Sequence, residues 1–341
     1  MRRMVWLVVA AAMMGGGLAG TARGAAAFVT VGEYRISGPY VHKNLALFLV
    51  HGRDKIAGKR FLTLDEALTR KLVVVHETGN VSQLAVENKS PHVHIYIQSG
   101  VIVKGGKQDR TIQYDMVLPP RSGKVALRSF CVEAGRWNRR GGEAADQFAA
   151  AKSNLATKEL KLAAKKAGSQ QQVWKSVAKV QGDLGRNLNA PVRARASASS
   201  LQLTLENKHL AKAAGEYTGA LSRPFARHTD VIGYAFAING EVNSADVYGS
   251  RDLFAKLRSS LLHAAAVEAI AKMKKGPTVA APNAQAIKAL FLQAEQGKKS
   301  EKDLTGGARM SVKESDKSIL FRVGDKTMPA ADFYRLEILS K

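Results

Sequence analysis

Several residue types are scarce in this sequence of 341 residues. It contains a single cysteine, Cys131, which excludes a disulfide framework within the chain and a thiolate-rich zinc site. Acidic residues are few, with 28 Asp and Glu against 52 Lys and Arg, so the formal net charge is +24. This excess predicts polyanionic surroundings, but charge bears on partners and solubility and says little about fold.

Aromatic residues make up 6% of the chain and are rarest where basic residues are densest. Residues 150–212 hold twelve basic and three acidic residues, and Trp174 is the one Phe, Tyr or Trp among them. Helices without aromatic side chains lack the surfaces on which bases stack. We therefore expect no specific nucleic-acid binding.

Long apolar runs are missing beyond the first residues, which have the features of an export signal. Arg2 and Arg3 precede an apolar run over residues 4–14, and Ala22 and Gly24 place small side chains before a cleavage point. The run is shorter than the ~20 residues that a membrane span needs, which favours cleavage over a retained anchor. We expect an extracytoplasmic protein, periplasmic or secreted, with residues 1–24 as signal peptide and no membrane span afterwards.

Familiar catalytic motifs are missing or incomplete. The sequence has neither G-x-S-x-G nor H-E-x-x-H, and Ser176-Val-Ala-Lys179 has none of the partner motifs of an S-x-x-K enzyme. Gly105-Gly-Lys107 resembles a phosphate loop, but Gln108 stands where a magnesium-binding hydroxyl is needed. These patterns assign no reaction.

The pattern of local signals predicts an α+β fold. Short runs rich in β-branched and aromatic residues between 28 and 137 predict an N-terminal sandwich or partial barrel. Thr63-Leu-Asp-Glu66 is a capping box, which predicts a short helix from Thr63 to Arg70. Asn239-Gly240 between two β-prone runs predicts a two-residue hairpin.

Helix-forming residues dominate the middle of the chain, and a mixed unit ends it. We expect helices over 144–154, 157–166, 170–184, 201–214, 250–274 and 284–296, a basic loop over 297–307, and final strands over 310–313, 319–323 and 333–339. The resulting division is a β-rich domain (25–140), a basic helical region (141–215), a β-hairpin plus helix packed on the β-rich domain (216–275), and a linker, helix and C-terminal β unit (276–341).

Two segments carry the residues best suited to a site. In Gly105-Gly-Lys-Gln-Asp-Arg110 the glycines allow a tight turn, Lys107 and Arg110 supply cations for carboxylate or phosphate, and Gln108 adds an amide. In Phe130-Cys-Val-Glu-Ala-Gly-Arg-Trp137, a charge at Arg136 stands beside the stacking surface of Trp137.

Glu133 is the candidate general acid or base, because a carboxyl group on a β face beside apolar residues can have its pKa raised. A second interpretation is structural, with Glu133 paired to Arg110 or Arg136 and Trp137 in the core. His92 and His94 are weak metal candidates on one strand face, against an ordinary surface pair. Cys131 is expected to be a buried thiol and not a nucleophile.

At these motifs the sequence resembles the ADP-ribosylglycohydrolase- and rhodanese-phosphatase-associated protein domain family, a bacterial and archaeal group without an assigned activity. The resemblance spans residues 34–271. It rests on Asn44-Leu45, Phe61-Leu-Thr-Leu-Asp-Glu-Ala-Leu68, Val86-Glu-Asn-Lys89, the two site segments, Gln172-Val-Trp174, Val231-Ile-Gly-Tyr234 and Asn239-Gly240. The family name implies association with enzymes that process ADP-ribose and phosphorylated compounds.

Two functions therefore stay open. The first is an exported protein that binds a small anionic or phosphorylated ligand through Lys107, Gln108, Arg110, Arg136 and Trp137, with hydrolysis of a nucleotide or ADP-ribose derivative by Glu133 as an extension. The second is a non-enzymatic envelope structural or polyanion-binding protein. No cofactor is expected in either case.

Overall fold

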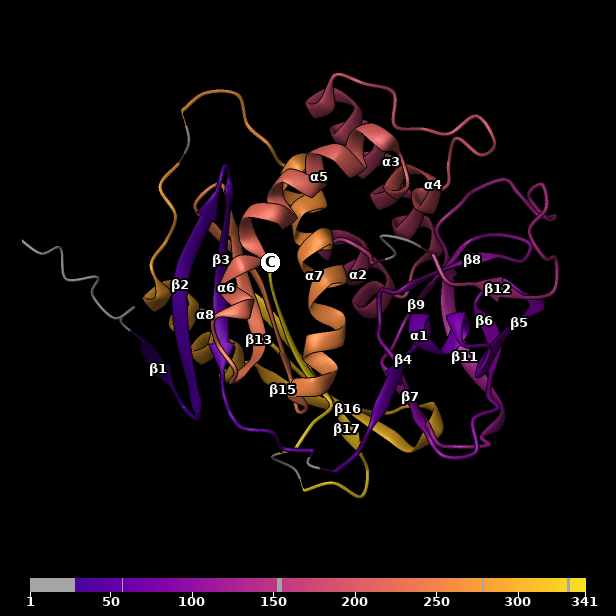
Figure 1. Cartoon of the computed structure of the whole chain (residues 1–341), viewed down its shortest axis with the longest axis horizontal. Coiled ribbons are helices and arrows are strands. Elements are labelled where there is room, and N and C mark those ends of the chain that lie inside the picture. Colours follow the sequence, from indigo (N-terminus) through magenta and orange to yellow (C-terminus); the bar gives the residue numbers. More distant parts are fainter. Residues whose placement is uncertain (1–27, 57, 152–154, 278, 330–331) are drawn as a thin grey trace, which may run out of the picture.

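The computed structural model describes residues 28–56, 58–151, 155–277, 279–329 and 332–341. The expected signal peptide therefore lies outside the described residues. Within them the chain is an α+β protein, as the sequence predicts, with a large antiparallel sheet on one side and a compact group of shorter strands on the other (Figure 1). Among these described residues, no helix has both the length and the apolar character needed to cross a membrane.

The large sheet has nine strands drawn from both ends and the middle of the chain. Their order is β1 (Val29–Val31), β2 (Tyr34–His42), β3 (Leu45–His51), β13 (Val231–Ile238), β14 (Glu241–Tyr248), β18 (Arg335–Ser340), β17 (Ser318–Asp325), β16 (Ala308–Glu314) and β15 (Lys298–Asp303). Because β3 pairs with β13 and β14 pairs with β18, strands from the expected units 25–140, 216–275 and 276–341 share one sheet.

The remaining strands form two smaller sheets that close into a nearly complete barrel. One has the order β10 (Met116–Leu118), β7 (His94–Ile97), β4 (Phe61–Thr63), and the other β12 (Phe148–Ala149), β8 (Ile102–Gly105), β9 (Arg110–Ile112), β11 (Gly123–Cys131), β6 (Gln83–Asn88), β5 (Val73–Asn80). An isolated bridge between His76 and Gln147 joins β5 back toward β12. The expected partial barrel is confirmed, and β1 to β3 lie outside it.

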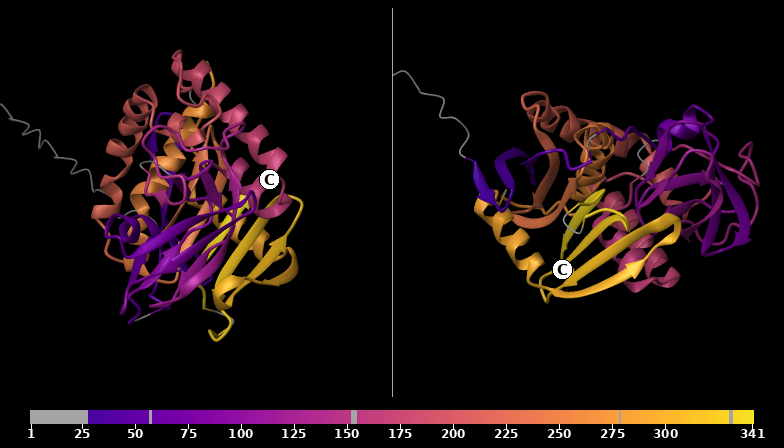
Figure 2. Two further views of the ribbon diagram at one scale, coloured as in Figure 1. Left: turned by 90° about the vertical axis from the view of Figure 1, so that its right-hand side faces the viewer. Right: turned by 90° about the horizontal axis from the view of Figure 1, so that it is seen from below.

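The helices cover both faces of the large sheet. They are α1 (Leu64–Thr69), α2 (Lys158–Leu162), a π-helical turn η1 (Ala163–Ala167), α3 (Gln170–Leu188), α4 (Leu201–Leu205), α5 (Lys208–Leu221), α6 (Arg223–Ala226), α7 (Arg251–Ala271), α8 (Ala284–Glu295) and a short 3₁₀ turn η2 (Thr305–Gly307). Along β3, Leu45, Leu47 and Leu49 belong to the apolar cluster of α7, whereas Ala46, Phe48 and Val50 belong to that of α8. The central strands are therefore buried on both faces, with α7 and α8 on opposite sides (Figure 2).

Local signals predicted two features well. Thr63 accepts from the Glu66 N–H and the Glu66 side chain accepts from the Thr63 N–H, so the capping box is confirmed. Asn239 and Gly240 have φ values of 52° and 83° between β13 and β14, which is the positive pair that this hairpin turn requires.

Three elements differ from expectation. The single helix expected over 201–214 is wrong, because Glu206 ends α4 and Asn207 caps the start of α5. Residues 144–149 do not form a helix, because β12 pairs with β8 and the Gly106 N–H donates to the carbonyls of Ala144 and Gln147. These backbone bonds replace the helical ones, and residues 152–154 lie outside the described ranges. The expected basic loop over 297–307 contains the exposed edge strand β15, whose charged side chains suit an edge that faces solvent.

A buried charge network joins the large sheet to the barrel. The guanidinium of Arg335, 1% exposed, donates to Asp246 at 2.5 Å, to Glu337 at 2.6 Å and to Asp115 at 3.2 Å. Lys165 of η1 donates to Glu337 at 2.5 Å. Each of these charges has an opposite partner within hydrogen-bond distance, which is the condition under which buried ions are tolerated.

Candidate functional site

Strand pairing brings the two candidate segments together. Gly105 ends β8, Arg110 begins β9, and Cys131 ends β11, where it lies directly opposite Arg110. Beyond this pair, the Val132 N–H donates to the Asp109 carbonyl. Residues 105–110 and 131–137 therefore form one continuous region at the end of the barrel.

Glu133 lies at the centre of this region and is completely buried. One carboxylate oxygen accepts from Arg136 at 2.7 Å and from the Asp109 N–H at 3.1 Å, and the other accepts from Arg140 at 3.2 Å. Burial by itself raises the pKa of Glu133, but hydrogen bonds from Arg136, Ser197 and the Asp109 N–H outweigh it and leave the pKa below its usual value. The expectation of a raised pKa is therefore wrong, and Glu133 is a buried carboxylate anchor.

Arg136 and Arg140 are held by the same group of acids and carbonyls. Arg136 donates to the carbonyls of Gly105 and Gly106 as well as to Glu133. Arg140 donates from all three guanidinium nitrogens to Asp109, Glu133 and Glu143. The guanidinium groups of both arginines are thus held in place by the buried carboxylates of Glu133 and Asp109.

Gln108 and Arg110 also point inward. Gln108 is 4% exposed and donates to the backbone carbonyl of Glu133 at 2.9 Å. The fully buried Arg110 donates to the Val81 carbonyl at 3.0 Å, contacts the thiol of Cys131 and lies 3.5 Å from Glu77. This arrangement matches the structural interpretation of these residues more closely than direct contact with a ligand.

Lys107 and Trp137 lie at the surface. Trp137 is 45% exposed, so it is not a core residue, and the ammonium of Lys107 lies 5.0 Å from the centre of its ring. The guanidinium of Arg110 lies 5.7 Å from the same ring. The indole is therefore contacted by two cations, one half-buried and one fully buried.

An open depression of about 640 Å³ lies over the arginine cluster. Residues 134–136, 138–141 and 196–199 line it, and they include Arg136, Arg139 and Arg140 but no acid. Arg139 is exposed, as are Arg193 and Arg195 in the adjoining segment. Arg139, Arg193 and Arg195 make no ion pair within the described part of the chain. They therefore contribute positive charge that no acidic side chain balances.

Sequence reasoning missed Asp109, Arg140 and Ser200. Asp109 stands inside the first segment and Arg140 just after the second, but neither was assigned a role there. In the structure Asp109 accepts from Arg140 and from the Ser200 hydroxyl at 2.7 Å. Ser200 also caps α4, so this contact fixes the helical region against the barrel. The available signal was an acidic residue, Asp109, inside the segment of glycines and cations that the sequence singles out.

The histidine pair predicted as a weak metal candidate is not arranged as expected. β7 begins at His94, so His92 lies in the preceding bend and the two side chains do not share a strand face. Neither belongs to a group of three ligating side chains within the described ranges.

This architecture defines an α+β protein in which a nine-stranded antiparallel sheet, covered by α7 and α8, is joined to a nearly closed barrel. The family model for ARPP-1, the ARG and Rhodanese-Phosphatase-superfamily-associated Protein domain, matches residues 33–327. The chain therefore belongs to this family, which is the one that its motifs resemble. No curated protein and no solved structure gives a significant match.

Several residues that carry the resemblance hold the fold together. Asn44 donates to the Ala269 carbonyl at the end of α7 and accepts from the Tyr217 hydroxyl at 2.8 Å. The Asn88 amide donates to the carbonyls of Val93 and Pro119. Side-chain amides of this kind, half-buried at Asn44 and buried at Asn88, satisfy backbone groups that no strand pairs.

Proposed function

We propose that the protein is exported and binds a small anionic ligand of the phosphorylated type in the depression over Arg136, Arg139 and Arg140. The observation that supports this proposal is the lining of the depression, which contains three arginines and no acid. A planar guanidinium suits phosphate and carboxylate oxygens in two-pronged geometry.

The three arginines take different parts in this proposal. Arg139 is exposed and would contact the ligand directly, whereas Arg136 and Arg140 form a floor whose position is fixed by Glu133 and Asp109. A fixed floor lowers the ordering cost of binding. Lys107 and Trp137 lie beside this cluster and offer a cation and a flat surface to a nucleoside or sugar ring.

Hydrolysis by Glu133 finds less support. A general acid needs a proton at the working pH and contact with the reacting group. The pKa of Glu133 lies below its usual value, and its two oxygens are occupied by Arg136, Arg140 and the Asp109 N–H. We therefore assign Glu133 as a positioning residue for the two arginines.

Thermal unfolding in the presence of ligands tests the proposal. ADP-ribose, sugar phosphates and nucleotides are expected to raise Tm more than inorganic phosphate at equal concentration, by mass action on the folded state. Arg139→Ala is expected to reduce this stabilisation, whereas Arg70→Ala, which removes an exposed arginine from the end of α1, is expected to leave it unchanged.

Two further outcomes separate the alternatives. No stabilisation beyond that of inorganic phosphate would contradict the proposal. Retention on an anionic polymer that falls steeply with salt and is equal in both variants would favour the polyanion-binding function. Export is tested separately. The mature chain recovered from outside the cytoplasm is expected to begin at Ala25.

A further inference from the structure

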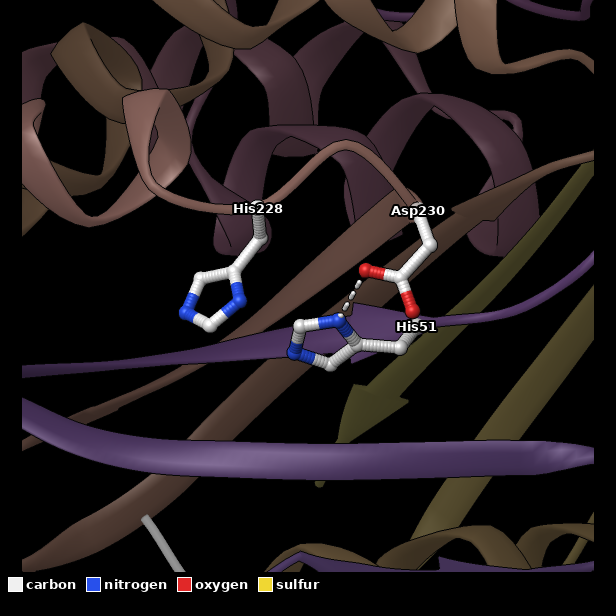
Figure 3. A group of neighbouring side chains, drawn as sticks. All are labelled: His51, His228 and Asp230. Carbon is white, nitrogen blue, oxygen red and sulfur yellow. Dashed lines mark hydrogen bonds and ion pairs between the residues drawn. The ribbon is translucent and has the colours of Figure 1, made fainter. Parts of the chain in front are cut away.

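Two histidines and an aspartate meet near the start of β13, in a place that none of the motifs above includes. His51 is the last residue of β3, and His228 and Asp230 lie between α6 and β13. Antiparallel pairing sets His51 opposite Val231, which brings the preceding segment over the imidazole. Figure 3 shows the two rings and the carboxylate facing one another. Their ligating atoms all lie within 4.8 Å, and no other such group of three occurs among the described residues.

The hydrogen bonds around the rings point each imidazole in a defined direction. The Nε2 atom of His51 lies 2.8 Å from the Ser37 hydroxyl, and the Nε2 atom of His228 lies 3.4 Å from the Tyr40 hydroxyl. Histidine ligands of metal ions usually have their second ring nitrogen held in this way by a neighbouring group. Both Nδ1 atoms then lie on the side of Asp230 (Figure 3).

The carboxylate is positioned by two neighbours. Its Oδ1 atom lies 2.8 Å from the Nδ1 atom of His51, and its Oδ2 atom accepts from Arg35 at 2.6 Å. Arg35 therefore occupies one oxygen and leaves the other directed at the two rings. The Nδ1–Oδ1 contact is a hydrogen bond, so a bound cation would replace the proton that joins these atoms.

In the neutral tautomer that donates from Nδ1 to Asp230, the Nε2 atom of His51 accepts from the Ser37 hydroxyl. On binding of a cation, Nδ1 of His51 loses its proton to solvent and Nε2 gains one from solvent, which it then donates to the Ser37 oxygen. The ring stays neutral, and the exchange releases no net proton.

We propose that His51, His228 and Asp230 bind a divalent transition-metal ion of the zinc type. Two imidazole nitrogens and one carboxylate oxygen suit Zn²⁺, whereas Ca²⁺ and Mg²⁺ need sets made of oxygen atoms. Three protein ligands leave a fourth position for water or another small ligand. His228 and Asp230 are partly exposed, so the ion can enter from solvent.

Ser37, His51 and Asp230 are hydrogen-bonded in the order of a serine-hydrolase triad. A catalytic triad is therefore the competing interpretation of this group. The Ser37 side chain is completely buried, so no substrate carbonyl can reach its oxygen in this structure. The rings of Phe28 and His228 pack edge-on against His51, with centres 5.0 and 4.9 Å from it. The geometry therefore favours a metal ligand at His51 over a general base for Ser37.

The test is a titration of the full chain, freed of metal by a chelator, with Zn²⁺ against a chromophoric chelator and with Co²⁺ by visible absorption. We expect one ion per chain and cobalt ligand-field bands. His228→Ala is expected to weaken zinc binding by about 100-fold or more, because losing a ligand costs at least as much as losing an outer partner. Ser37→Ala is expected to weaken it by about tenfold.

His92→Ala is the matched control, because it removes an exposed histidine that belongs to no such group. It is expected to bind zinc as the parent does. Asp230→Asn keeps the side-chain shape and repeats the test if His228→Ala fails to fold by circular dichroism. Absence of binding in the parent, equal binding in the folded His228 or Asp230 variant, or covalent labelling of Ser37 by a fluorophosphonate in the metal-free protein would each overturn the proposal. Its failure leaves the anion-binding proposal standing, since the arginine depression shares no residue with this group.

Discussion

Arg140 donates two parallel hydrogen bonds to Asp109, each 3.0 Å long, across 31 positions of sequence. Both side chains are buried, and Glu133 and Glu143 occupy the remaining donors of the same guanidinium. The pair therefore joins the turn after β8 to the loop after β11. The floor of the arginine-lined depression depends on this contact.

Arg140→Lys should test how far the fold depends on the two-pronged contact. Lysine keeps the charge but cannot donate in a planar fork, so buried carboxylate oxygens would lose partners. We expect the free energy of unfolding in urea to fall by about 2–3 kcal/mol. Arg139→Lys changes the exposed neighbour and should stay within about 0.5 kcal/mol of the parent. Equal losses in the two variants would show that the fork contributes little.

Glu133→Gln tests the electrostatic part of the same cluster through pH. The folded-state pKa of Glu133 is lowered, so its contribution to stability is present above the unfolded pKa of about 4.3 and disappears as pH falls through the folded value. The variant should therefore be less stable than the parent at pH 7, by about 2 kcal/mol. The gap should narrow as the parent's carboxylate becomes protonated. Urea unfolding at pH 7, 5 and 3 measures it, and a gap that is constant or wider in acid would contradict this assignment.

The features that sequence predicted correctly depend on neighbours in the chain. The capping box of α1 needs Thr63 and Glu66, and the β13–β14 turn needs Asn239 and Gly240. In each case the deciding contacts span three residues or fewer, and the residue types carry the required conformation themselves. Burial of Cys131 was also expected and is confirmed.

The features that sequence could not supply depend on distant partners. The pairing of β3 with β13 joins segments about 180 positions apart, and no local pattern specifies it. The group of His51, His228 and Asp230 exists only because of that pairing. Likewise, Glu133 has a lowered pKa because Arg136 and Arg140 converge on it, whereas its apolar sequence neighbours alone suggested the opposite shift.

Gly105→Ala tests the turn that presents the first segment. Gly105 has a φ value of 125°, and an added Cβ would lie 3.0 Å from the Gln147 carbonyl oxygen. Alanine is strained at this φ, and the backbone at Gln147, just before β12, would have to move as well. We expect a loss of about 2–3 kcal/mol in the free energy of unfolding. Gly142→Ala, where an added Cβ meets nothing within 4 Å, should change it by about 0.5 kcal/mol or less. Similar values for both would mean that the turn tolerates other conformations.

Cys131 gives a probe of the same region that needs no substitution at the site. Its side chain is fully buried against Arg110, and burial raises the pKa of the thiol, so both access and thiolate formation oppose its reaction. We expect the aromatic disulfide DTNB to react with the folded protein at least about 100-fold more slowly than with the urea-unfolded chain, because reaction requires local opening. Ser222→Cys adds a thiol at an exposed position and supplies the internal reference, with one fast and one slow equivalent. Two fast equivalents in the folded variant would show that the end of β11 opens readily, and that the arginine cluster above it is not a fixed floor.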